Sequence, residues 1–353
     1  MRIATLANAA VIHTRRWVEH FRARGHEVGL WSLETGPASL GTRRLPSAPL
    51  PGFLRYPLAV PALRAALAEF RPDLVDAHFV PNYGLMGVLA GVRPLTVTAW
   101  GSDLLVAGPR DPLQAARARF VLSRADAVLA DSGNLGTAAR ALGARAGRVR
   151  VIPWGVDPER FRPAPARTPG LLLSTRLHEP IYDLATLLQG VATLMPARPG
   201  LHLVVAGDGS QRAALQALAA RLMPAGACEF VGRLDPEMLA GWLGRSEIYL
   251  SASRSDSTSV SLLEAMASGA VPVVSDLEGN REWVDEGEGA RLFAPGDAEG
   301  CARALRRALD DPAWCDGARA RNARVIAERG CWPKNLAAIE ACFEALVAEA
   351  RAG

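Results

Sequence analysis

The stretch that decides the fold is Ser251–Val274, SASRSDSTSVSLLEAMASGAVPVV. An apolar strand ends at Ser251, a polar loop follows, a helix runs from Val260 to just before Gly269, and a second apolar strand begins. Strand, loop, helix and strand in this order are typical of a parallel sheet with crossover helices. The polar loop therefore lies at the carboxyl end of a strand, where ligands bind in open parallel sheets.

The residue types in this loop suit an anionic ligand. Ser257, Thr258 or Ser259 can cap the helix that follows. The backbone N–H groups of the first helical turn lack intrahelical partners and lie at the positive end of the helix dipole, which favours a diphosphate. Glu264 follows Val260 by four residues and projects from the same helix face. A carboxylate accepts two hydrogen bonds, which suits a vicinal ribose diol.

The same alternation of strands and helices extends through both halves of the chain. In the first half it predicts strands at Arg2–Leu6, Glu27–Trp31, Leu74–His78, Leu95–Ala99, Ala127–Asp131 and Val149–Ile152, with helices at Thr14–Ala23, Ala59–Phe70, Pro112–Ser123 and Leu135–Leu142. In the second half it predicts strands at Leu171–Ser174, Leu201–Ala206, Glu229–Val231, Ile248–Ser251 and Val271–Ser275, with helices at Leu184–Leu194, Gln211–Leu222, Pro236–Leu243, Val260–Ala267 and Pro333–Ala350.

Two segments break the pattern. Gly36–Pro57 is rich in proline, glycine and arginine and predicts an irregular loop. The proline-rich segment 161–170 has the composition of an interdomain linker. We therefore expect an α/β protein with four parts, in which two domains have sheets that face a central cleft. The expected parts are a first domain over 1–160, the linker over 161–170, a second domain over 171–330 and a helix over 331–353 that packs back on the first domain.

Length and composition narrow the protein class. A chain of 353 residues can form two domains that each bury a core. Its five cysteines form no Cys-x-x-Cys pair, so the sequence predicts neither a disulfide framework nor a zinc site, and no other metal site is expected. No apolar run approaches the ~18 residues that span a bilayer, and the first residues predict a strand, not a secretory signal. We expect a cytoplasmic protein.

Charge is unevenly distributed along the chain. Residues 1–165 hold 21 arginines against 12 acidic residues, a balance of +9, whereas the net charge of the whole chain is only +4. Such asymmetry indicates an anionic partner of the first half, or else simple drift in surface charge. An anionic membrane surface would fit, because cations of the first half and apolar residues of Gly36–Pro57 occur close together in the sequence. We therefore expect a peripheral contact at the inner membrane face.

The stretch quoted first resembles the signature of glycosyltransferase family 4. Members of that family are retaining enzymes with the GT-B fold, two Rossmann-like domains that act on a nucleotide-sugar. In the family, two glutamates flank seven residues before Ala-Met-Ala-x-Gly; the first lies near the donor sugar and the second binds the donor ribose. The resemblance places Asp256 in the first position and Glu264 in the second. It also implies that Thr258, Ser259 and Val260 supply the amides that hold the diphosphate.

Further matches follow in the family's order. Gly207 and Asp208 belong to a segment that looks like its Gly-Asp-Gly turn, and Gly232 ends a segment that looks like the strand near the nucleobase. Arg176 matches the arginine that binds the donor diphosphate, a role that suits a guanidinium. The segment Pro153–Pro163 resembles the family's entry to the linker. Arg176, Asp256 and Trp100 are the candidate catalytic residues. By resemblance, the leaving diphosphate is stabilised by Arg176 and the helix dipole without a metal.

The sequence departs from the family at four places. Asp256 is shorter than the usual glutamate by one methylene group. The usual lysine is replaced by Ile181 or Tyr182, and Arg233 or Arg254 is a candidate to compensate. The remaining two departures concern the first domain. Trp100 occupies the position of a histidine, so proton transfer by that residue is excluded, but its ring can stack on a sugar; the loop 7–17 lacks the frequent Gly-Gly.

Four polar residues near the carboxyl ends of first-half strands are candidates for the acceptor site. They are Asn8, His13, His78 and Asp103. The two histidines could bind acceptor or donor oxygens, or serve as polar caps. Asp103 could bind acceptor hydroxyls or cap the segment after Gly101. These alternatives stay open at the level of sequence.

The expected function is transfer of a sugar from a nucleotide-sugar, UDP- or GDP-linked, to a hydroxyl acceptor in synthesis of a surface polysaccharide, glycolipid or related conjugate. The acceptor could be a glycan, a lipid-linked sugar or a small soluble molecule. No cofactor and no nucleic-acid partner are expected. A hydride-transfer enzyme is excluded because residues 7–17 contain no glycine, whereas a dinucleotide fold needs a glycine-rich first turn. A nucleotide-sugar epimerase and a non-catalytic binding subunit are the alternatives.

Overall fold

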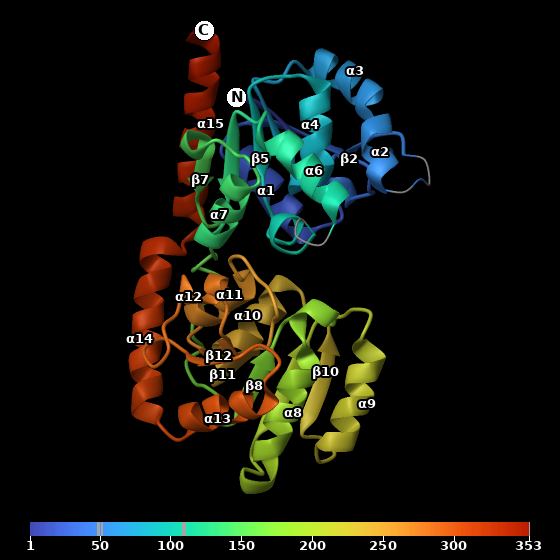
Figure 1. Ribbon diagram of the computed structural model, residues 1–353. Coiled ribbons are helices and arrows are strands. Elements are labelled where there is room, and N and C mark those ends of the chain that lie inside the picture. The colour runs from blue at the N-terminus through green and yellow to red at the C-terminus, as the bar shows by residue number, and fades with distance from the viewer. Residues whose placement is uncertain (48–49, 51, 108–110, 353) are drawn as a thin grey trace. The chain divides into compact units, whose positions relative to one another are not determined.

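The computed structural model describes residues 1–47, 50, 52–107 and 111–352. The chain forms two compact units (Figure 1). Unit 1 contains residues 1–152 together with the C-terminal residues from Ala337 on, and unit 2 contains Pro153–Leu336. Within the described ranges, no helix is long and apolar enough to cross a membrane.

Unit 1 is built on a seven-stranded sheet in which all pairs are parallel, in the order β3-β2-β1-β4-β5-β6-β7. Its strands are β1 (Arg2–Leu6), β2 (Glu27–Ser32), β3 (Arg43–Arg44), β4 (Leu74–His78), β5 (Leu95–Thr98), β6 (Ala127–Ala130) and β7 (Val149–Val151). Its helices are α1 (Ile12–Ala23), α2 (Gly52–Leu58), α3 (Val60–Phe70), α4 (Leu85–Ala90), α6 (Pro112–Leu122) and α7 (Gly133–Ala141). The order of the strands reverses between β1 and β4.

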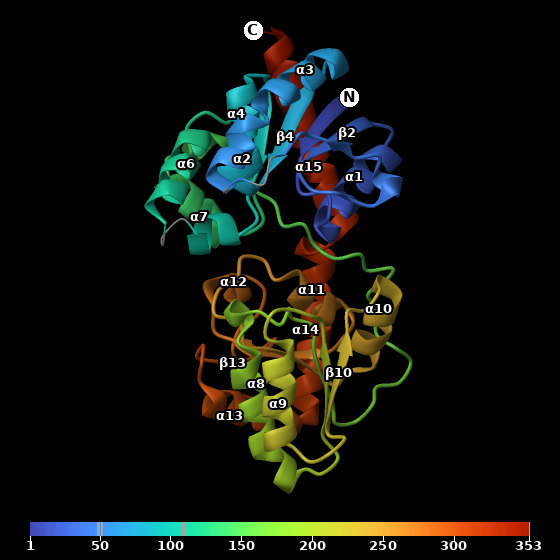
Figure 2. The ribbon, with the colours of Figure 1, turned by 90° about the vertical axis from the view of Figure 1, so that its right-hand side faces the viewer.

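Unit 2 has a six-stranded sheet, also parallel throughout, in the order β10-β9-β8-β11-β12-β13. Figure 2 shows β10 and β13 on opposite sides of this unit. Its strands are β8 (Leu171–Ser174), β9 (His202–Ala206), β10 (Cys228–Gly232), β11 (Ile248–Ser251), β12 (Val271–Ser275) and β13 (Arg291–Phe293). Its helices are α8 (Leu184–Leu194), α9 (Arg212–Leu222), α10 (Pro236–Arg245), α11 (Val260–Ala267), α12 (Glu278–Arg281), α13 (Ala298–Leu309) and α14 (Pro312–Arg329). Here the strand order reverses between β8 and β11.

Both faces of the second sheet are buried along its central strands β8, β11 and β12. Alternate residues of β8 point to opposite faces: Leu172 belongs to the core under α8 and α13, whereas Leu171 and Leu173 belong to the core under α10 and α11. A parallel sheet covered by helices on both faces reads as continuous apolar runs. This burial explains why the sequence located these short strands so closely.

Three helices begin with the same dipeptide, Asp-Pro. The side chain of Asp111 accepts hydrogen bonds from the amides of Leu113 and Gln114, and Asp235 and Asp311 cap α10 and α14 in the same way. The aspartate satisfies amides that have no intrahelical partner, and the proline that follows has no N–H to satisfy. These caps define where the helices start.

The segment Gly36–Pro57 was predicted to be an irregular loop, and this prediction is wrong in part. The structure places a single 3-10 turn at Ala38–Leu40, strand β3 and helix α2 within or across it. Proline 57 is tolerated because it lies in the last turn of a seven-residue helix, where it removes only one backbone hydrogen bond. Strand β13 and the helices α4, α12, α13 and α14 were also not predicted from the sequence. The strand completes the sheet of unit 2, and the helices pack in the two units.

The proline-rich segment 161–170, expected to be a linker, runs along unit 2. Phe161 is buried, and the amides of Ala164 and Thr168 donate to the carbonyls of Gly244 and Arg245 at the end of α10. The last helix, α15 (Trp332–Ala352), contributes its C-terminal part to unit 1. There Phe343 stacks on Phe21 with ring centroids 5.4 Å apart, and Glu340 pairs with Arg24 and His26.

Candidate functional site

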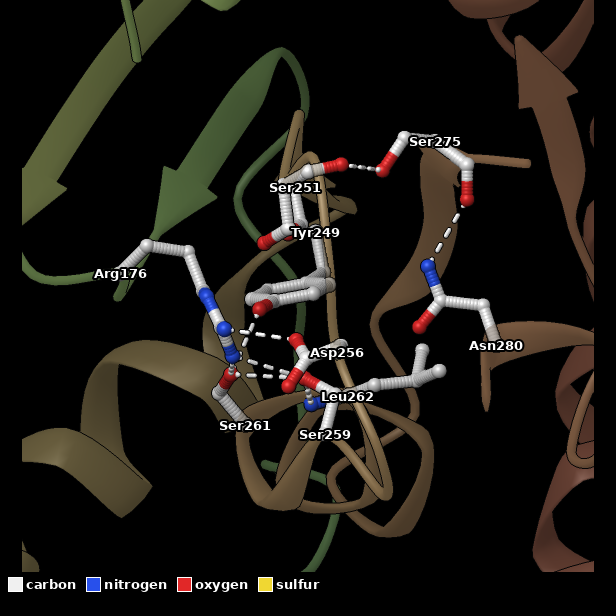
Figure 3. A network of polar contacts seen from close by, with 10 residues as sticks. Arg176, Tyr249, Ser251, Asp256, Ser259, Ser261, Leu262, Ser275 and Asn280 are labelled. Carbon is white, nitrogen blue, oxygen red and sulfur yellow. Dashed lines mark hydrogen bonds and ion pairs between the residues drawn. The ribbon is translucent and has the colours of Figure 1, made fainter. Parts of the chain in front are cut away.

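In unit 2, Arg176 lies at the point where the strand order reverses. It follows β8, and the loop from Ser251 to Ser259 follows the neighbouring strand β11. Figure 3 shows the guanidinium directed toward Asp256 and the first turn of α11. Nη2 donates to Oδ2 of Asp256 over 2.6 Å, and Nη1 donates to the hydroxyl oxygens of Ser259 and Ser261 over 2.8 and 2.7 Å.

The surroundings of Arg176 keep it charged. Burial disfavours the charge, but the Asp256 carboxylate, Tyr249 and Tyr182 together more than offset that penalty and raise the pKa of Arg176 above its usual value. The ring of Tyr182 lies under the guanidinium, with 4.2 Å between Cζ and the ring centroid. Tyr182 is one of the two residues at the place of the family's lysine. The aromatic face of Tyr182 therefore supports the guanidinium of Arg176.

The loop before α11 is held by hydrogen bonds and close contacts with neighbouring elements. Ser259 caps the helix and accepts from the amide of Leu262, and Tyr249 of β11 donates to Ser261 over 2.9 Å. On the far side of the loop, the hydroxyl of Ser275 donates to the carbonyl of Ser253 over 2.6 Å. Gly279 lies so close that a Cβ there would be 2.2 Å from the carbonyl oxygen of Ser257. The loop is thus held in one position by β11, β12 and α12.

The other residues predicted to bind the donor lie in this loop and on α11. Ser257, Thr258 and Ser259 are buried, and the indole of Trp283 donates to the hydroxyl of Thr258 over 3.4 Å. Val260 and Glu264 are half-buried, one turn apart on α11. The structure therefore brings Asp256, Thr258, Ser259, Val260 and Arg176 together, with Glu264 one helical turn beyond them.

The turn after β9 approaches Arg176 closely. Gly207 has a φ of +114°, and a Cβ at this position would lie 2.7 Å from the carbonyl oxygen of Arg176. The amide of Gly207 donates to the carbonyl of Gly232, and the carbonyl of Asp208 accepts from the amide of His178. Arg212 of α9 reaches the carbonyls of Gly207 and Phe230. Glycine is therefore required where this turn passes the arginine.

Arg254 and Arg233, the two arginines predicted to replace the missing lysine, differ in their contacts. Arg254 is 56% exposed and pairs with Asp183 across 2.7 Å, so part of its charge is already engaged. Its backbone amide donates to the carbonyl of Ile181, which ties the loop to the segment carrying Tyr182. Arg233 follows β10 and is exposed. The sequence did not single out Tyr249, Ser261 or Arg212, because their roles depend on partners distant in sequence.

In unit 1, the predicted acceptor residues gather where strand order reverses between β1 and β4. Asn8 follows β1 and its side chain accepts from the amide of Ala10; His13 lies in the first turn of α1. The His13 ring meets the edge of Trp100, with centroids 5.9 Å apart. Burial and the nearby Arg16 lower the pKa of His13 to about 4, so the ring is neutral at neutral pH.

His78 ends β4 and is buried. Its Nδ1 is 3.1 Å from the indole nitrogen of Trp100, and its Nε2 is 2.8 Å from Oδ2 of Asp76. Asp76 and His78 are alternate residues of β4 and share one face of the sheet, but the hydrogen bond between them was not predicted from the sequence. Trp100 itself is half-buried.

Asp103 is fully buried and has a structural use. Its two carboxylate oxygens accept from the amides of Trp100 and Val80 over 3.1 and 3.0 Å. Burial raises the pKa of this carboxyl to about 6 in spite of those hydrogen bonds. The sequence left two uses open for Asp103, binding acceptor hydroxyls or capping the segment after Gly101. Its hydrogen bonds to backbone amides are those of a cap.

Comparison with known proteins agrees with the fold and with the sequence signature. Residues 10–160 match the family described as Glycosyltransferase Family 4, and residues 168–311 match Glycosyl transferases group 1. The 2-deoxystreptamine glucosyltransferase of Streptomyces kanamyceticus is 30% identical over 288 residues, which cover 71% of this chain and 73% of that protein. The sulfoquinovosyl transferase SQD2 of Arabidopsis thaliana is 28% identical over 331 residues; the match covers 84% of this chain but 63% of that longer protein.

Solved structures show the same architecture. Sucrose-phosphate synthase from Thermosynechococcus elongatus superposes with a TM-score of 0.87 at 21% identity, covering 99% of this chain and 100% of that one. HepE of Anabaena, in complex with UDP-glucose, superposes with a TM-score of 0.83 at 18% identity, covering 98% and 100%. Taken with the matches of both halves of the sequence, this likeness shows that the chain belongs to glycosyltransferase family 4 and has the GT-B fold.

Proposed function

We propose that this enzyme transfers a sugar from a nucleotide-sugar to a hydroxyl acceptor with retention of anomeric configuration. The observation that carries the proposal is the buried cation Arg176 beside the N-terminus of α11 at the reversal of strand order. A fixed positive charge and the unpaired amides of a helix start form an anion site without a metal ion. Nε of Arg176 is buried and has no hydrogen-bond partner among the described residues, so the guanidinium keeps one donor that its own unit does not satisfy.

The residues around this site have distinct proposed roles. Thr258, Ser259 and Val260 supply amides to the diphosphate, and Glu264 binds the ribose diol one helical turn further along. The turn Gly207–Asp208 and the residues Gly232 and Arg233 lie on the side of the nucleobase. Arg254 adds charge at the rim.

Asp256 and Arg176 are proposed to act together. A diphosphate at the start of α11 attracts the same guanidinium that Asp256 binds. Asp256 orients Arg176, and the arginine stabilises the negative charge that develops on the leaving diphosphate. The shorter aspartate suits this role, because at its position it reaches the guanidinium directly.

The acceptor is proposed to bind unit 1 near Asn8 and His13. His78, also predicted to bind it, is 1% exposed and has both ring nitrogens in hydrogen bonds to Asp76 and Trp100, so it does not reach a ligand directly. A surface glycan or glycolipid precursor fits the arginine content of this half, and a contact with anionic membrane belongs to the same proposal. Some arginines of unit 1 are already engaged and are less available to a membrane surface. Arg22, Arg24 and Arg55 bind groups of their own unit, and Arg43 lies over Trp31. Leu54 and Leu58, one turn apart on α2, are exposed and supply apolar surface. Phe53, also part of the expected membrane contact, has a side chain outside the described residues.

Substrate screening tests the proposal directly. UDP, GDP and their sugar conjugates are added in a thermal-shift assay, where a ligand at 100 times its Kd stabilises the protein by about 2.7 kcal/mol. UDP compounds come first because HepE, a structural relative, was solved with UDP-glucose. Product formation with glycan and lipid-linked acceptors is followed by mass spectrometry, and anomeric configuration by NMR. Conversion of the sugar without an acceptor would indicate an epimerase, and binding without turnover a non-catalytic subunit.

Flotation with vesicles tests the membrane contact separately. We expect the protein to float with anionic vesicles at low salt and to be released at high salt, because such attraction is screened. Failure to bind anionic vesicles at low salt would remove the membrane contact from the proposal and leave the transferase assignment untouched.

A further inference from the structure

A network of hydrogen bonds in unit 1 links three buried residues to a half-exposed aromatic ring. Trp100, immediately beyond the carboxyl end of β5, contacts His78 of β4; His78 contacts Asp76; and the hydroxyl of Thr98 donates to the second oxygen of Asp76 over 3.0 Å. Asp76, His78 and Thr98 are 0–1% exposed. Asp76, His78 and Thr98 are therefore shielded from water, and only Trp100 is partly exposed.

The direction of every hydrogen bond in this network follows from chemistry. An indole N–H can only donate, so Nδ1 of His78 accepts the bond from Trp100. The proton of a neutral His78 therefore resides on Nε2, which donates to the Asp76 carboxylate. A buried carboxylate next to the histidine holds the ring in this tautomer, as second partners of functional histidines do.

Further contacts fix the position of Trp100. The ring of Trp17 packs edge-on against His78 with centroids 4.9 Å apart, and the backbone amide of Trp100 donates to Asp103. The His13 ring stands at 87° to the indole plane. Both the backbone and the side chain of Trp100 are therefore anchored, although nothing about a half-exposed tryptophan requires it. Such anchoring lowers the entropic cost of binding a ligand on the ring.

We propose that Trp100 is a platform on which a pyranose ring stacks, and that His78 and Asp76 are positioning residues that hold it. The C–H groups on one face of a pyranose pack well against the electron-rich face of an indole. The ring lies at the carboxyl edge of the sheet, beside the reversal of strand order, where ligands of such sheets bind. This inference rests on the proposed function for the identity of the ligand as a sugar.

The pyranose can come from two sources, the transferred sugar of the donor or a sugar of the acceptor. Eight tryptophans give eight indole N–H signals in an NMR spectrum of tryptophan-labelled protein. Loss of one signal in Trp100→Phe identifies that of Trp100. The full chain is titrated with UDP, with UDP-glucose, and with methyl glycosides of glucose, galactose and mannose.

We expect the Trp100 signal to move with a sugar but not with UDP alone. Movement with UDP-glucose only assigns the platform to the donor sugar, and movement with a methyl glycoside assigns it to the acceptor. A signal that ignores every sugar at concentrations that saturate UDP binding, or that moves equally with UDP, overturns the proposal. If no nucleotide binds by calorimetry, the proposed function fails, while the methyl glycosides still decide on the platform.

Variants of His78 test the positioning role. In His78→Leu the indole loses its acceptor, and we expect KM for the sugar-bearing substrate to rise about three- to ten-fold with little change in kcat. His78→Asn offers an amide oxygen near the place of Nδ1 and should restore much of the loss. Trp314→Phe is the matched control, since it also removes an indole hydrogen bond, to the carbonyl of Gly287 in unit 2. Equal effects of His78→Leu and His78→Asn on KM would contradict the positioning role.

A spectroscopic measurement checks the same role without activity. Nitrogen-15 shifts of labelled histidine should show His78 protonated on Nε2 and not on Nδ1. The opposite tautomer would contradict the hydrogen-bond direction on which the proposal depends.

Discussion

Nη2 of Arg176 donates to Oδ2 of Asp256 over 2.6 Å, although 80 residues separate the two along the chain. Their side chains are 9% and 16% exposed, and they meet at the carboxyl ends of β8 and β11. A buried ion pair adds little stability over an apolar pair of the same shape, but an unpaired buried charge is costly. The pair is therefore better explained by the proposed diphosphate site than by stability.

A double-mutant cycle tests this relationship. Arg176→Met leaves the Asp256 carboxylate buried beside an apolar chain and should lower the free energy of unfolding by about 3 kcal/mol. Arg176→Met with Asp256→Leu should recover much of that loss and still fail to bind nucleotide. Urea unfolding gives the stabilities and calorimetry the binding. Additive effects of the two substitutions on stability would show that the ion pair has no energetic coupling.

Glu264→Ala should weaken nucleotide binding while the fold survives. Loss of a charged hydrogen-bond partner costs about 1.5–3 kcal/mol, which is at least a ten-fold increase in Kd. Glu264→Gln keeps one acceptor oxygen and should fall between the wild type and the alanine variant. Calorimetric titration with UDP measures all three proteins, and an unchanged Kd in Glu264→Ala would remove Glu264 from the donor site.

Gly279→Ala should displace the loop before α11, which is proposed to bind the diphosphate. The added Cβ would lie 2.2 Å from the carbonyl oxygen of Ser257 and 2.7 Å from that of Asp256, so the loop must shift. Overpacking of this kind costs about 1–3 kcal/mol, and nucleotide affinity should fall with it. The control is Gly317→Ala, on the exposed side of α14, where nothing lies within 4 Å of the added carbon. It should be neutral or slightly stabilising, since alanine is the better helix former.

Stability should depend on pH through His13. Burial and Arg16 lower its folded pKa to about 4, whereas the unfolded chain has a value of about 6.5, so the unfolded state binds the proton first. The contribution of neutral His13 to the free energy of unfolding is therefore complete above pH ~6.5. It is lost as the pH drops toward 4, which lowers the free energy of unfolding by at most about 3 kcal/mol. His13→Gln should flatten this part of the curve. Urea titrations between pH 4 and 8 compare the two proteins, and parallel curves would contradict the assignment.

Turnover should continue in excess chelator, because Arg176 and the start of α11 supply the positive charge that a metal would otherwise bring. Activity is measured with and without EDTA, before and after re-addition of magnesium. A complete loss that magnesium reverses would contradict a metal-independent mechanism.

Strands, most helices and the start of α11 followed from local sequence. Continuous apolar runs such as β8 and β11 must be buried on both faces, and Ser259 can cap α11 through its immediate neighbours, so each signal is complete within a few residues. The family signature added roles for Arg176, Asp256 and Glu264 by resemblance. The helix α2 was missed because its proline lies where a short helix can tolerate one.

Side-chain partners could not be found in this way, because they depend on which strands are neighbours. The reversal of strand order places β11 next to β8, and only then does Arg176 meet Asp256 and Ser261; the corresponding order in unit 1 places Trp100 within reach of His78. Hydrogen bonds and ion pairs act over a few ångströms in space, whereas sequence patterns report burial and backbone preference along the chain. Trp100 was visible as an unusual residue, but its anchoring by His78 and Asp76 emerged from folding alone.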